Sequence, residues 1–266
     1  MIPARQVKRR LEGDRLAYYV VTADATFWDR HWQQELRPES FNVAAQGGGL
    51  GRFKQPFRRY LPREGRVLEA GCGLGLHVIA LRALGYDAEG VEWAEETVKA
   101  VQGFCPGVPI RVGDVTKLEV PDGSYRGYIS LGVVEHQKDG PEPFLREACR
   151  VLAPEGVAFV SVPFVNPLRR AKARLGRYRD KVDGLQFYQY AFTEAEFTAL
   201  LQHSGFQIVT RSFYGGFKGI KDEIPTIRQI AQRGFIGQWI QRRIETASWA
   251  KRNVGHMILF VCRKPG

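Results

Sequence analysis

Long apolar runs, paired cysteines and a balance of acidic residues are all missing from this chain of 266 residues. No window is apolar for long enough to span a bilayer, so no transmembrane helix is predicted. The first residues, MIPARQVKRRLEGD, also lack the apolar core of a signal peptide. We therefore expect a cytoplasmic protein, and peripheral contact with a membrane stays open.

The chain has only 4 cysteines, and no two of them form a CxxC pair. Scattered cysteines of this kind exclude a disulfide framework and a cysteine-based zinc site, and they indicate reduced thiols. The four positions are Cys72, Cys105, Cys149 and Cys262.

Acidic residues are too few to balance the basic ones, because 28 Asp and Glu stand against 39 Lys and Arg, a formal net charge of +11. Such a surplus is typical of proteins that contact nucleic acid, an anionic membrane surface or an acidic substrate. It is equally typical of a solvated basic surface with no partner. The charge alone leaves these alternatives open.

What the chain does have is organised around one stretch, RVLEAGCGLG at residues 66–75. Its first residues predict the end of a buried strand, and Gly71, Gly73 and Gly75 predict a tight turn before a helix. An open α/β sheet presents backbone N–H groups and a helix N-terminus to a nucleotide-like ligand in this way. Glycine is required there because the ligand must approach the backbone closely.

Two acids sharpen this interpretation. Glu69 lies two residues before the first glycine, and Glu92 ends a second hydrophobic segment about 20 residues after the turn, where an acid can accept hydrogen bonds from ribose hydroxyls. The position where a dinucleotide site requires a third Gly or Ala is Leu76. The stretch therefore favours a nucleoside-containing ligand other than a nicotinamide dinucleotide.

Strand and helix patterns alternate along the rest of the chain, which predicts an α/β fold with a mostly parallel sheet covered on both faces. We expect strands near 66–70, 87–92, 109–112, 126–131, 156–162, 206–213 and 256–262. We expect helices near 23–34, 52–60, 75–84, 94–103, 141–152, 193–203 and inside 225–252. In such a sheet the ligand lies beyond the carboxyl ends of the strands.

The segments EAGCGLG, GVEW, RVGDVTKLEV, YRGYISLGVVEH and LREACRVLAPEGVAFVSVP follow one another in an order that resembles the class I S-adenosylmethionine-dependent methyltransferases, in their small-molecule and quinone-biosynthesis branch. The resemblance runs from about Tyr60 to Val162 and resumes at YAFTEAEFTALLQHSGF. It implies a Rossmann-like, doubly wound sheet of seven strands with the last one antiparallel, and S-adenosylmethionine as the cofactor.

The resemblance also implies a cofactor site. Glu69 and the glycine turn would lie along the methionine portion of the cofactor. Glu92 would accept hydrogen bonds from the ribose hydroxyls, and Asp114 would accept one from the adenine amino group. Trp93 would pack on the adenine face. The full set of implied cofactor residues is Glu69, Gly71, Gly73, Gly75, Glu92, Trp93, Asp114, Val115, Ser130, Leu131 and Gly132.

Two titratable residues, Glu135 and His136, follow the fourth predicted strand, where the transferred methyl group would lie. His136 is the first candidate for a general base because the unperturbed pKa of histidine is near neutrality, and a packing histidine is the alternative. The related quinone O-methyltransferases bind a divalent metal here with two glutamates and a histidine. Gly132 stands where their first glutamate does, so we predict no metal.

We divide the chain into an N-terminal helical arm or cap, residues 1–60, and a methyltransferase domain, residues 61–266, with basic insertions at 166–189 and 214–253. In the arm, Phe27, Trp28, His31 and Trp32 share helix faces and serve either the substrate or the core. The pattern of segment 225–252 predicts a basic amphipathic helix. This helix would pack on the sheet, form a lid over the substrate or contact an anionic membrane surface. Its apolar stripe comprises Ile236, Ile240, Ile244 and Ala247, with Trp239 alongside.

The sequence thus favours a methyltransferase acting on a small molecule, with the acceptor atom open between O, N and C. An RNA methyltransferase is the main alternative because of the charge. The fourth strand ends in SLGV, however, and lacks the Asn/Asp-Pro-Pro-aromatic signature of enzymes that methylate base amines. A non-catalytic S-adenosylmethionine-binding protein is the other alternative.

Overall fold

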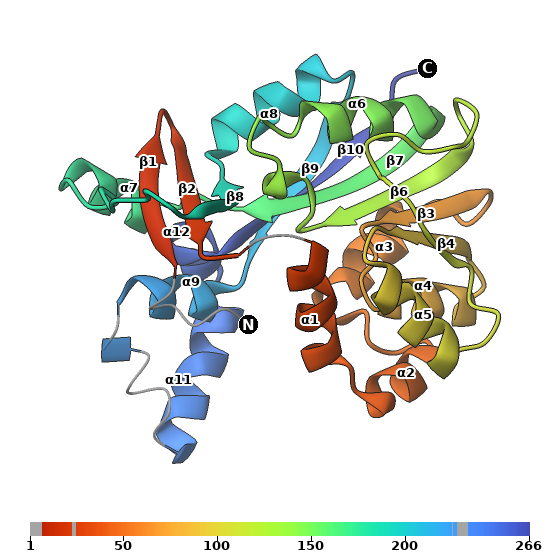
Figure 1. Cartoon of the computed structure of the whole chain (residues 1–266), viewed down its shortest axis with the longest axis horizontal. Helices are drawn as coiled ribbons and strands as arrows, with labels where there is room; N and C mark the ends of the chain where they lie inside the picture. The colour runs from red at the N-terminus through yellow and green to blue at the C-terminus, as the bar shows by residue number, and fades with distance from the viewer. Residues whose placement is uncertain (1–6, 23–24, 225, 228–233) are drawn as a thin grey trace.

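The computed structural model describes residues 7–22, 25–224, 226–227 and 234–266. Its centre is a seven-stranded sheet in the order β5-β4-β3-β6-β7-β10-β9 (Figure 1). Its strands are β3 (Arg66–Ala70), β4 (Asp87–Glu92), β5 (Ile110–Val112), β6 (Tyr125–Leu131), β7 (Leu152–Pro163), β9 (Gln207–Tyr214) and β10 (Met257–Arg263).

The first five of these strands pair in parallel, and β10 runs antiparallel to both β7 and β9. The chain order reverses at β3, which lies between β4 and β6. The inner parallel strands are buried on both faces, so they carry near-continuous apolar residues, such as VAFV at residues 157–160 of β7, in place of a strict alternation. All seven expected strands, and the antiparallel last one, are confirmed.

Helices cover both faces of this sheet (Figure 1). One face carries α3 (Lys54–Tyr60), α4 (Leu76–Ala83) and α5 (Glu95–Phe104), and α2 (Pro38–Ala45) packs on α4. The other face carries α6 (Glu142–Val151) and α8 (Glu194–His203). The apolar side chains beneath these helices form the two large clusters of the core.

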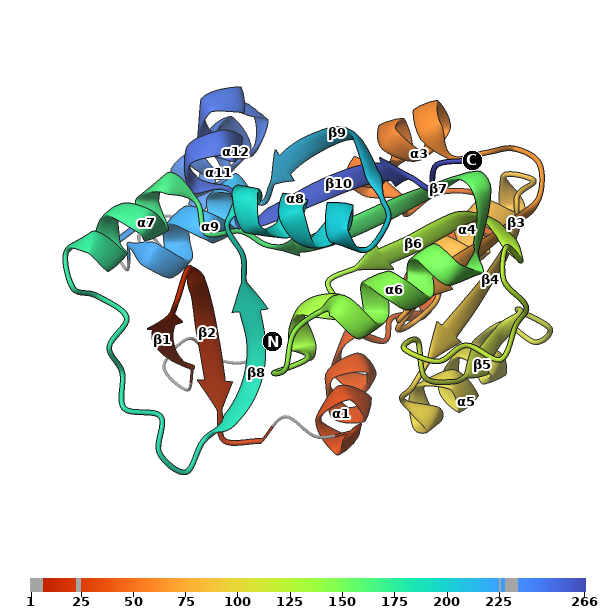
Figure 2. The ribbon, with the colours of Figure 1, turned by 90° about the horizontal axis from the view of Figure 1, so that it is seen from above.

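A second structure, which we call the cap, lies at the end of the molecule toward which β6 and β7 run (Figure 2). It is a three-stranded antiparallel sheet with four helices around it. Its members are β1 (Lys8–Glu12), β2 (Arg15–Val20), β8 (Gln186–Ala191), α7 (Pro167–Arg174), α9 (Gly216–Glu223), α11 (Gly234–Thr246) and α12 (Ser248–Val254).

The cap joins the N-terminal arm to both insertions. Strand β2 pairs with β8, so residues 15–20 of the arm lie against the end of the first insertion. Helix α12 packs on α9 and α7, which links the second insertion to the first. Helix α1 (Ala25–Glu35) then crosses from the cap to the body in front of the sheet edge (Figure 1).

Candidate active site

The turn after β3 is shaped by its glycines. Gly71, Gly73 and Gly75 all have positive φ angles, of 73°, 52° and 62°. A Cβ on Gly73 would stand 2.5 Å from the Trp32 ring, so a larger residue fits neither the backbone nor the space. We call residues 71–75 the glycine turn.

Glu92 clamps this turn from the end of the neighbouring strand β4. Its Oε2 accepts a hydrogen bond from the Gly73 N–H at 2.8 Å, and its Oε1 accepts from the N–H groups of Trp93 at 3.0 Å and Ala94 at 3.1 Å. Burial is the main cause that raises the pKa of Glu92, and these N–H groups oppose it. The predicted acid and the predicted turn are therefore in direct contact.

Glu69 lies on the other side of the turn and pairs with the first turn of α4. Its Oε1 lies 2.8 Å from Nδ1 of His77, while its buried Oε2 has no hydrogen-bond partner among the described residues. Burial lowers the pKa of His77, but the facing Glu69 carboxylate outweighs burial and the net shift is upward. One carboxylate oxygen of Glu69 thus stays available to a donor from a ligand.

The remaining predicted cofactor residues occupy the adjoining strand ends. Asp114 follows β5, and its Oδ1 accepts from the N–H of Thr116 at 2.8 Å and from its hydroxyl at 2.7 Å. Val115 beside it is buried, whereas the Trp93 side chain is 56% exposed. Ser130 and Leu131 end β6, and Gly132 follows with a φ of 76°.

The arrangement of these groups fits a nucleoside with a charged amino-acid tail. The glycine turn leaves backbone uncovered by any Cβ, and the unpartnered Oε2 of Glu69 can accept from an ammonium group. Glu92 and Asp114 are carboxylates at neighbouring strand ends, joined through the Gly113 N–H, which donates to the Glu92 carbonyl at 3.0 Å. They are among the residues that the sequence predicts for S-adenosylmethionine binding.

Glu135 and His136 lie in a short 3-10 helix, Val134–His136, directly after β6. Glu135 is 2% exposed, and its Oε2 has no hydrogen-bond partner among the described residues. Burial raises the pKa of Glu135 to about 8. This carboxyl group is therefore mostly protonated at neutral pH when nothing is bound beside it.

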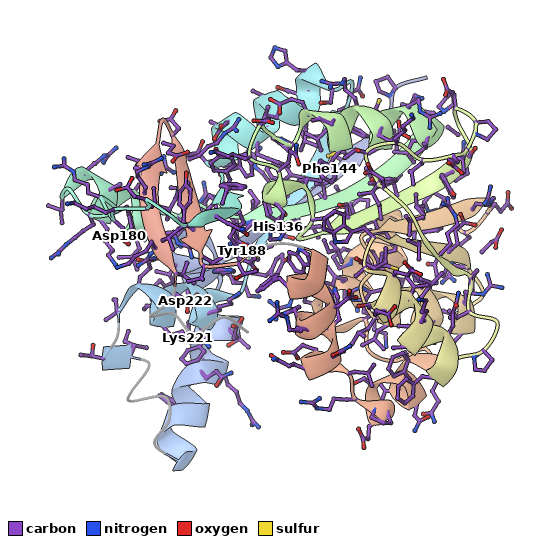
Figure 3. The ribbon with its side chains drawn as sticks, viewed as in Figure 1. His136, Phe144, Asp180, Tyr188, Lys221 and Asp222 are labelled. Carbon is purple, nitrogen blue, oxygen red and sulfur yellow. The ribbon has the colours of Figure 1, made fainter. Side chains whose placement is uncertain are left out.

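His136 is held by the cap. Its Nδ1 lies 2.7 Å from the Tyr188 carbonyl oxygen of β8, and Figure 3 shows the two side chains together between body and cap. Burial lowers the pKa of His136 to about 4. The ring is therefore neutral at pH 7 and joins the edge of the sheet to the cap.

Aromatic side chains from α1 surround this junction. Trp28 lies with its ring centroid 4.7 Å from His136 and stacks on Tyr188 at 6.1 Å, and Phe27 meets Tyr188 edge-on at 5.7 Å. Helix α1 is anchored to the body because Asp29 accepts from the N–H and hydroxyl of Thr97 at 3.2 and 3.1 Å. We call Phe27, Trp28, His136 and Tyr188 the ring cluster.

Sequence reasoning did not identify several residues at this edge. Tyr188 belongs to the run FYQY, whose alternating aromatic pattern indicates a strand but not its partner. Tyr214 ends β9, and Lys218 lies on α9; neither follows a motif. No grouping of three or more His, Cys, Asp or Glu in the described parts of the chain could hold a metal ion. Among those same residues, no helix is long and apolar enough to cross a membrane.

Comparison with known proteins places this geometry in a family. The sequence model of a protein family described as "Methyltransferase domain" matches residues 44–211 of this chain. The chain is 34% identical, over 53% of its own length, to the "Probable S-adenosylmethionine-dependent methyltransferase" of Mycolicibacterium smegmatis, and it spans about half of that relative (52%).

Named relatives include proteins that methylate different atoms. The ajmaline N-methyltransferase of Rauvolfia serpentina is 36% identical over 33% of this chain and 32% of that protein. The ubiquinone biosynthesis O-methyltransferase of Xanthomonas axonopodis pv. citri is 30% identical over 56% of this chain and 66% of that protein.

The fold also matches solved structures. A chain of the complex between the Haloferax volcanii Trm112 methyltransferase activator and a methyltransferase superposes with a TM-score of 0.58 and 19% identity, covering 90% of this chain and 96% of that one. At this identity the likeness concerns the fold alone.

Proposed function

This chain belongs to the methyltransferase family, and from that premise we propose that it transfers the methyl group of S-adenosylmethionine to a small-molecule acceptor. It is an enzyme, and S-adenosylmethionine is its cofactor. The acceptor and the roles of individual residues belong to the proposal.

The observation that carries the proposal is the adjacency of two sites on one sheet edge. Strands β3 and β6 pair directly in parallel, so the glycine turn after β3 and Glu135 after β6 face the same space. A cofactor on the turn would present its methyl group toward Glu135. The ring cluster covers this space from the cap side, which suits a small acceptor.

Methyl transfer from a sulfonium is an in-line displacement of an already activated group. The chain must hold the donor and acceptor in line, exclude competing water, and remove a proton where the acceptor carries one. Glu69, Glu92, Asp114 and the glycine turn would fix the cofactor. The ring cluster would exclude water, and Glu135 would take the proton.

His136 fits a positioning role better than the role of a base. One ring nitrogen is engaged by the Tyr188 carbonyl, and burial lowers the pKa of His136 to about 4, which makes it a weak base. Glu135, with its pKa near 8, is the stronger base of the two predicted residues.

An RNA methyltransferase is less well supported. A buried carboxyl group and packed rings line the space next to the cofactor residues, and a carboxylate repels backbone phosphates. A non-catalytic S-adenosylmethionine-binding protein would not require an unpaired carboxyl group beside the methyl position.

The test is a titration of the purified protein with S-adenosylmethionine, S-adenosylhomocysteine and NAD, followed by an assay for methyl transfer to a panel of small acceptors. We expect binding of the first two ligands, no binding of NAD, and transfer to a subset of the panel. Binding of NAD alone, or transfer to RNA but to no small molecule, would refute the proposal.

We also propose that the cap helices α11 and α12 contact an anionic membrane surface. Trp239 and Trp249 are 54% and 64% exposed, and the Arg243 guanidinium lies 5.3 Å above the Trp239 ring. A hollow lined by Arg243, Ile244, Thr246, Ala247 and Trp249 lies between the two helices. Exposed tryptophans beside basic residues are typical of helices that lie on anionic bilayers.

The predicted stripe of this segment is only partly visible. Trp239, Ile244 and Ala247 are described, whereas the side chains of Ile236 and Ile240 lie outside the described residues. Helix α11 projects from the body in Figure 1, and the contacts found for it within the described residues are chiefly with α9 and α12. This placement favours a surface contact over packing on the sheet.

A further inference from the structure

Glu135 differs from the other buried glutamates of the described chain in having no donor from another residue. Glu69 faces His77, Glu92 accepts from three backbone N–H groups, Glu147 pairs with Arg150, and Glu223 pairs with Arg169. In the described parts of the chain, the groups that lower the pKa of Glu135 against burial are its own backbone N–H and the charge of Lys218. A buried carboxyl group without a partner is costly, so a ligand that supplies the partner would explain its retention.

The groups that face Glu135 come from every neighbouring element. Gly132 leaves room beside it, since a Cβ there would stand 3.5 Å from Oε1 and 3.9 Å from the Met257 methyl. Burial is the main cause that raises the pKa of Tyr188 on β8 and of Tyr214 on β9, and the charge of Glu135 also raises both. Lys218 on α9 is the nearby cation on which the charge of Glu135 acts. The rings around these groups are joined by His136, 4.9 Å from Tyr188, and by His31, 5.8 Å from Trp28, and the Arg52 guanidinium lies 4.8 Å from the Tyr214 ring.

These neighbours are mostly rings. Tyr188 stacks against Trp28, and Tyr214 is fixed because its hydroxyl donates to Oγ of Ser161 at 3.0 Å. Burial is the main cause that lowers the pKa of both His31 and His136, so both rings are neutral at pH 7. Aromatic faces beside one carboxylate attract organic cations.

We propose that the methyl acceptor is a primary or secondary amine whose protonated nitrogen is bound by the Glu135 carboxylate beside the stacked rings of Trp28 and Tyr188. This inference rests on the proposed methyl transfer and names the class of its acceptor. A carboxylate or phosphate acceptor would be repelled by Glu135. A neutral hydroxyl would leave Glu135 protonated and would gain nothing from its charge.

The chemistry balances with the groups present. The bound ammonium passes one proton to Oε2 of Glu135, which frees the nitrogen lone pair. The lone pair attacks the methyl carbon, the carbon–sulfur bond breaks, and its electron pair stays on sulfur. The product is an N-methylated ammonium, and Glu135 returns its proton to solvent when the product leaves.

The test uses benzyltrimethylammonium, a permanent cation that cannot react, and benzyl alcohol as its neutral counterpart. Both are titrated into the protein saturated with S-adenosylhomocysteine. We expect the cation to bind at least about tenfold more tightly than the alcohol. Glu135→Gln should lose that preference without changing the affinity for S-adenosylhomocysteine, and Glu155→Gln, an exposed surface control, should change neither.

The pH profile gives a second readout. Because the probe does not titrate, its affinity for the wild-type protein should rise on the order of tenfold from pH 6.5 to 8.5 as Glu135 ionises. Burial also lowers the pKa of the nearby Lys218, and the residual slope in Glu135→Gln measures the share of groups other than Glu135. In the assay, N-methylbenzylamine should be methylated and benzyl alcohol should not.

Equal binding of cation and alcohol, or a flat pH profile in the wild-type protein, would overturn the amine acceptor while leaving methyl transfer intact. Failure of the wild-type protein to bind S-adenosylhomocysteine would instead overturn the proposed function itself. If Glu135→Gln does not fold, the wild-type pH profile and the two probes still decide the question.

Discussion

The cofactor side and the cap are built from contacts of very different range. On the cofactor side, the clamp between Gly73 and Glu92 joins residues 19 positions apart. In the cap, His136 meets Tyr188 across 52 positions, and Arg9 meets Glu223 across 214. The cofactor side is therefore a local device of two strands and a turn, whereas the cap exists only once distant segments have come together.

The two regions also treat charge differently. The acids of the cofactor side accept mostly from backbone N–H groups and one histidine, which keeps them able to bind a ligand. The main acid of the cap, Glu223, is saturated by side chains. It accepts from Arg9 at 2.6 Å, Arg169 at 3.1 Å, Lys172 at 2.7 Å and the Tyr178 hydroxyl at 2.7 Å. We expect the cap acid to hold structure and the cofactor acids to hold ligand.

The largest effect should come from Glu223→Gln, which tests whether the cap is held by this one carboxylate. Arg169 and Glu223 are both fully buried, so the change leaves a buried guanidinium without its counter-charge. The expected loss is about 3–5 kcal/mol in the free energy of unfolding. Urea denaturation measures it, with Glu155→Gln, an exposed ion pair, expected to change stability by less than about 1 kcal/mol.

The same carboxylate should make the free energy of unfolding depend on pH in the acid range. Burial alone would raise the pKa of Glu223, but Arg169 and Arg9 lower it to about 2. Its contribution is therefore complete above the unfolded pKa of about 4.3 and is lost as the pH falls toward 2. A Glu223→Gln protein whose stability keeps the wild-type pH dependence between these values would contradict this account.

The next largest effect is expected from a substitution on the cofactor side that leaves the cap intact. Glu92→Ala removes the clamp of the glycine turn and leaves three N–H groups unpaired. We expect the affinity for S-adenosylmethionine to fall by about 2–3 kcal/mol, or about 30- to 150-fold, with cap stability unchanged. Calorimetric titration measures the affinity.

The matched control for this change is Glu89→Ala, three residues earlier on the same strand. Glu89 pairs with Arg66 at 2.7 Å and lies away from the turn. Equal loss of affinity in both variants would mean that strand β4, and not the Glu92 carboxylate, determines binding.

This difference in range decided what the sequence could predict. The strands, the glycine turn and the place of Glu92 at the end of the second strand follow from patterns within a few tens of residues, and the seven expected strands are present. The pairing of β2 with β8 was not predicted because no local pattern joins residues 15–20 to residues 186–191. The cap sheet was therefore not predicted.

Side-chain environment was also beyond the sequence. His136 was chosen as a base on the unperturbed pKa of histidine, but burial in the folded chain lowers that pKa to about 4. The placement of Trp93 on the adenine face stays a prediction, since this side chain is 56% exposed. Trp32, from a helix far earlier in the chain, is the ring that lies against Gly73.

That contact offers a smaller test of whether the two regions meet. Gly73→Ala should lower the affinity for S-adenosylhomocysteine by about 1–2 kcal/mol, because the residue has a φ of 52° and its Cβ would strike the Trp32 ring. Adding Trp32→Ala should restore part of this loss, an interaction of about 0.5–1 kcal/mol in a double-mutant cycle. Strictly additive effects would show that α1 does not cover the turn in solution.

The smallest effect concerns the outer surface of the cap. If α11 and α12 lie on an anionic bilayer, Arg252→Ser should weaken sedimentation with phosphatidylserine-containing vesicles by about 1 kcal/mol, or about fivefold. The control Arg58→Ser removes an equally exposed charge from α3, on the body, and should weaken binding less. Vesicles of phosphatidylcholine alone should bind little, and salt should release the protein from the charged ones. Equal effects of the two substitutions would show that the attraction depends on net charge and not on the cap surface. The cap would then differ from the body through the aromatic residues that it places at the acceptor site, and not through a membrane contact.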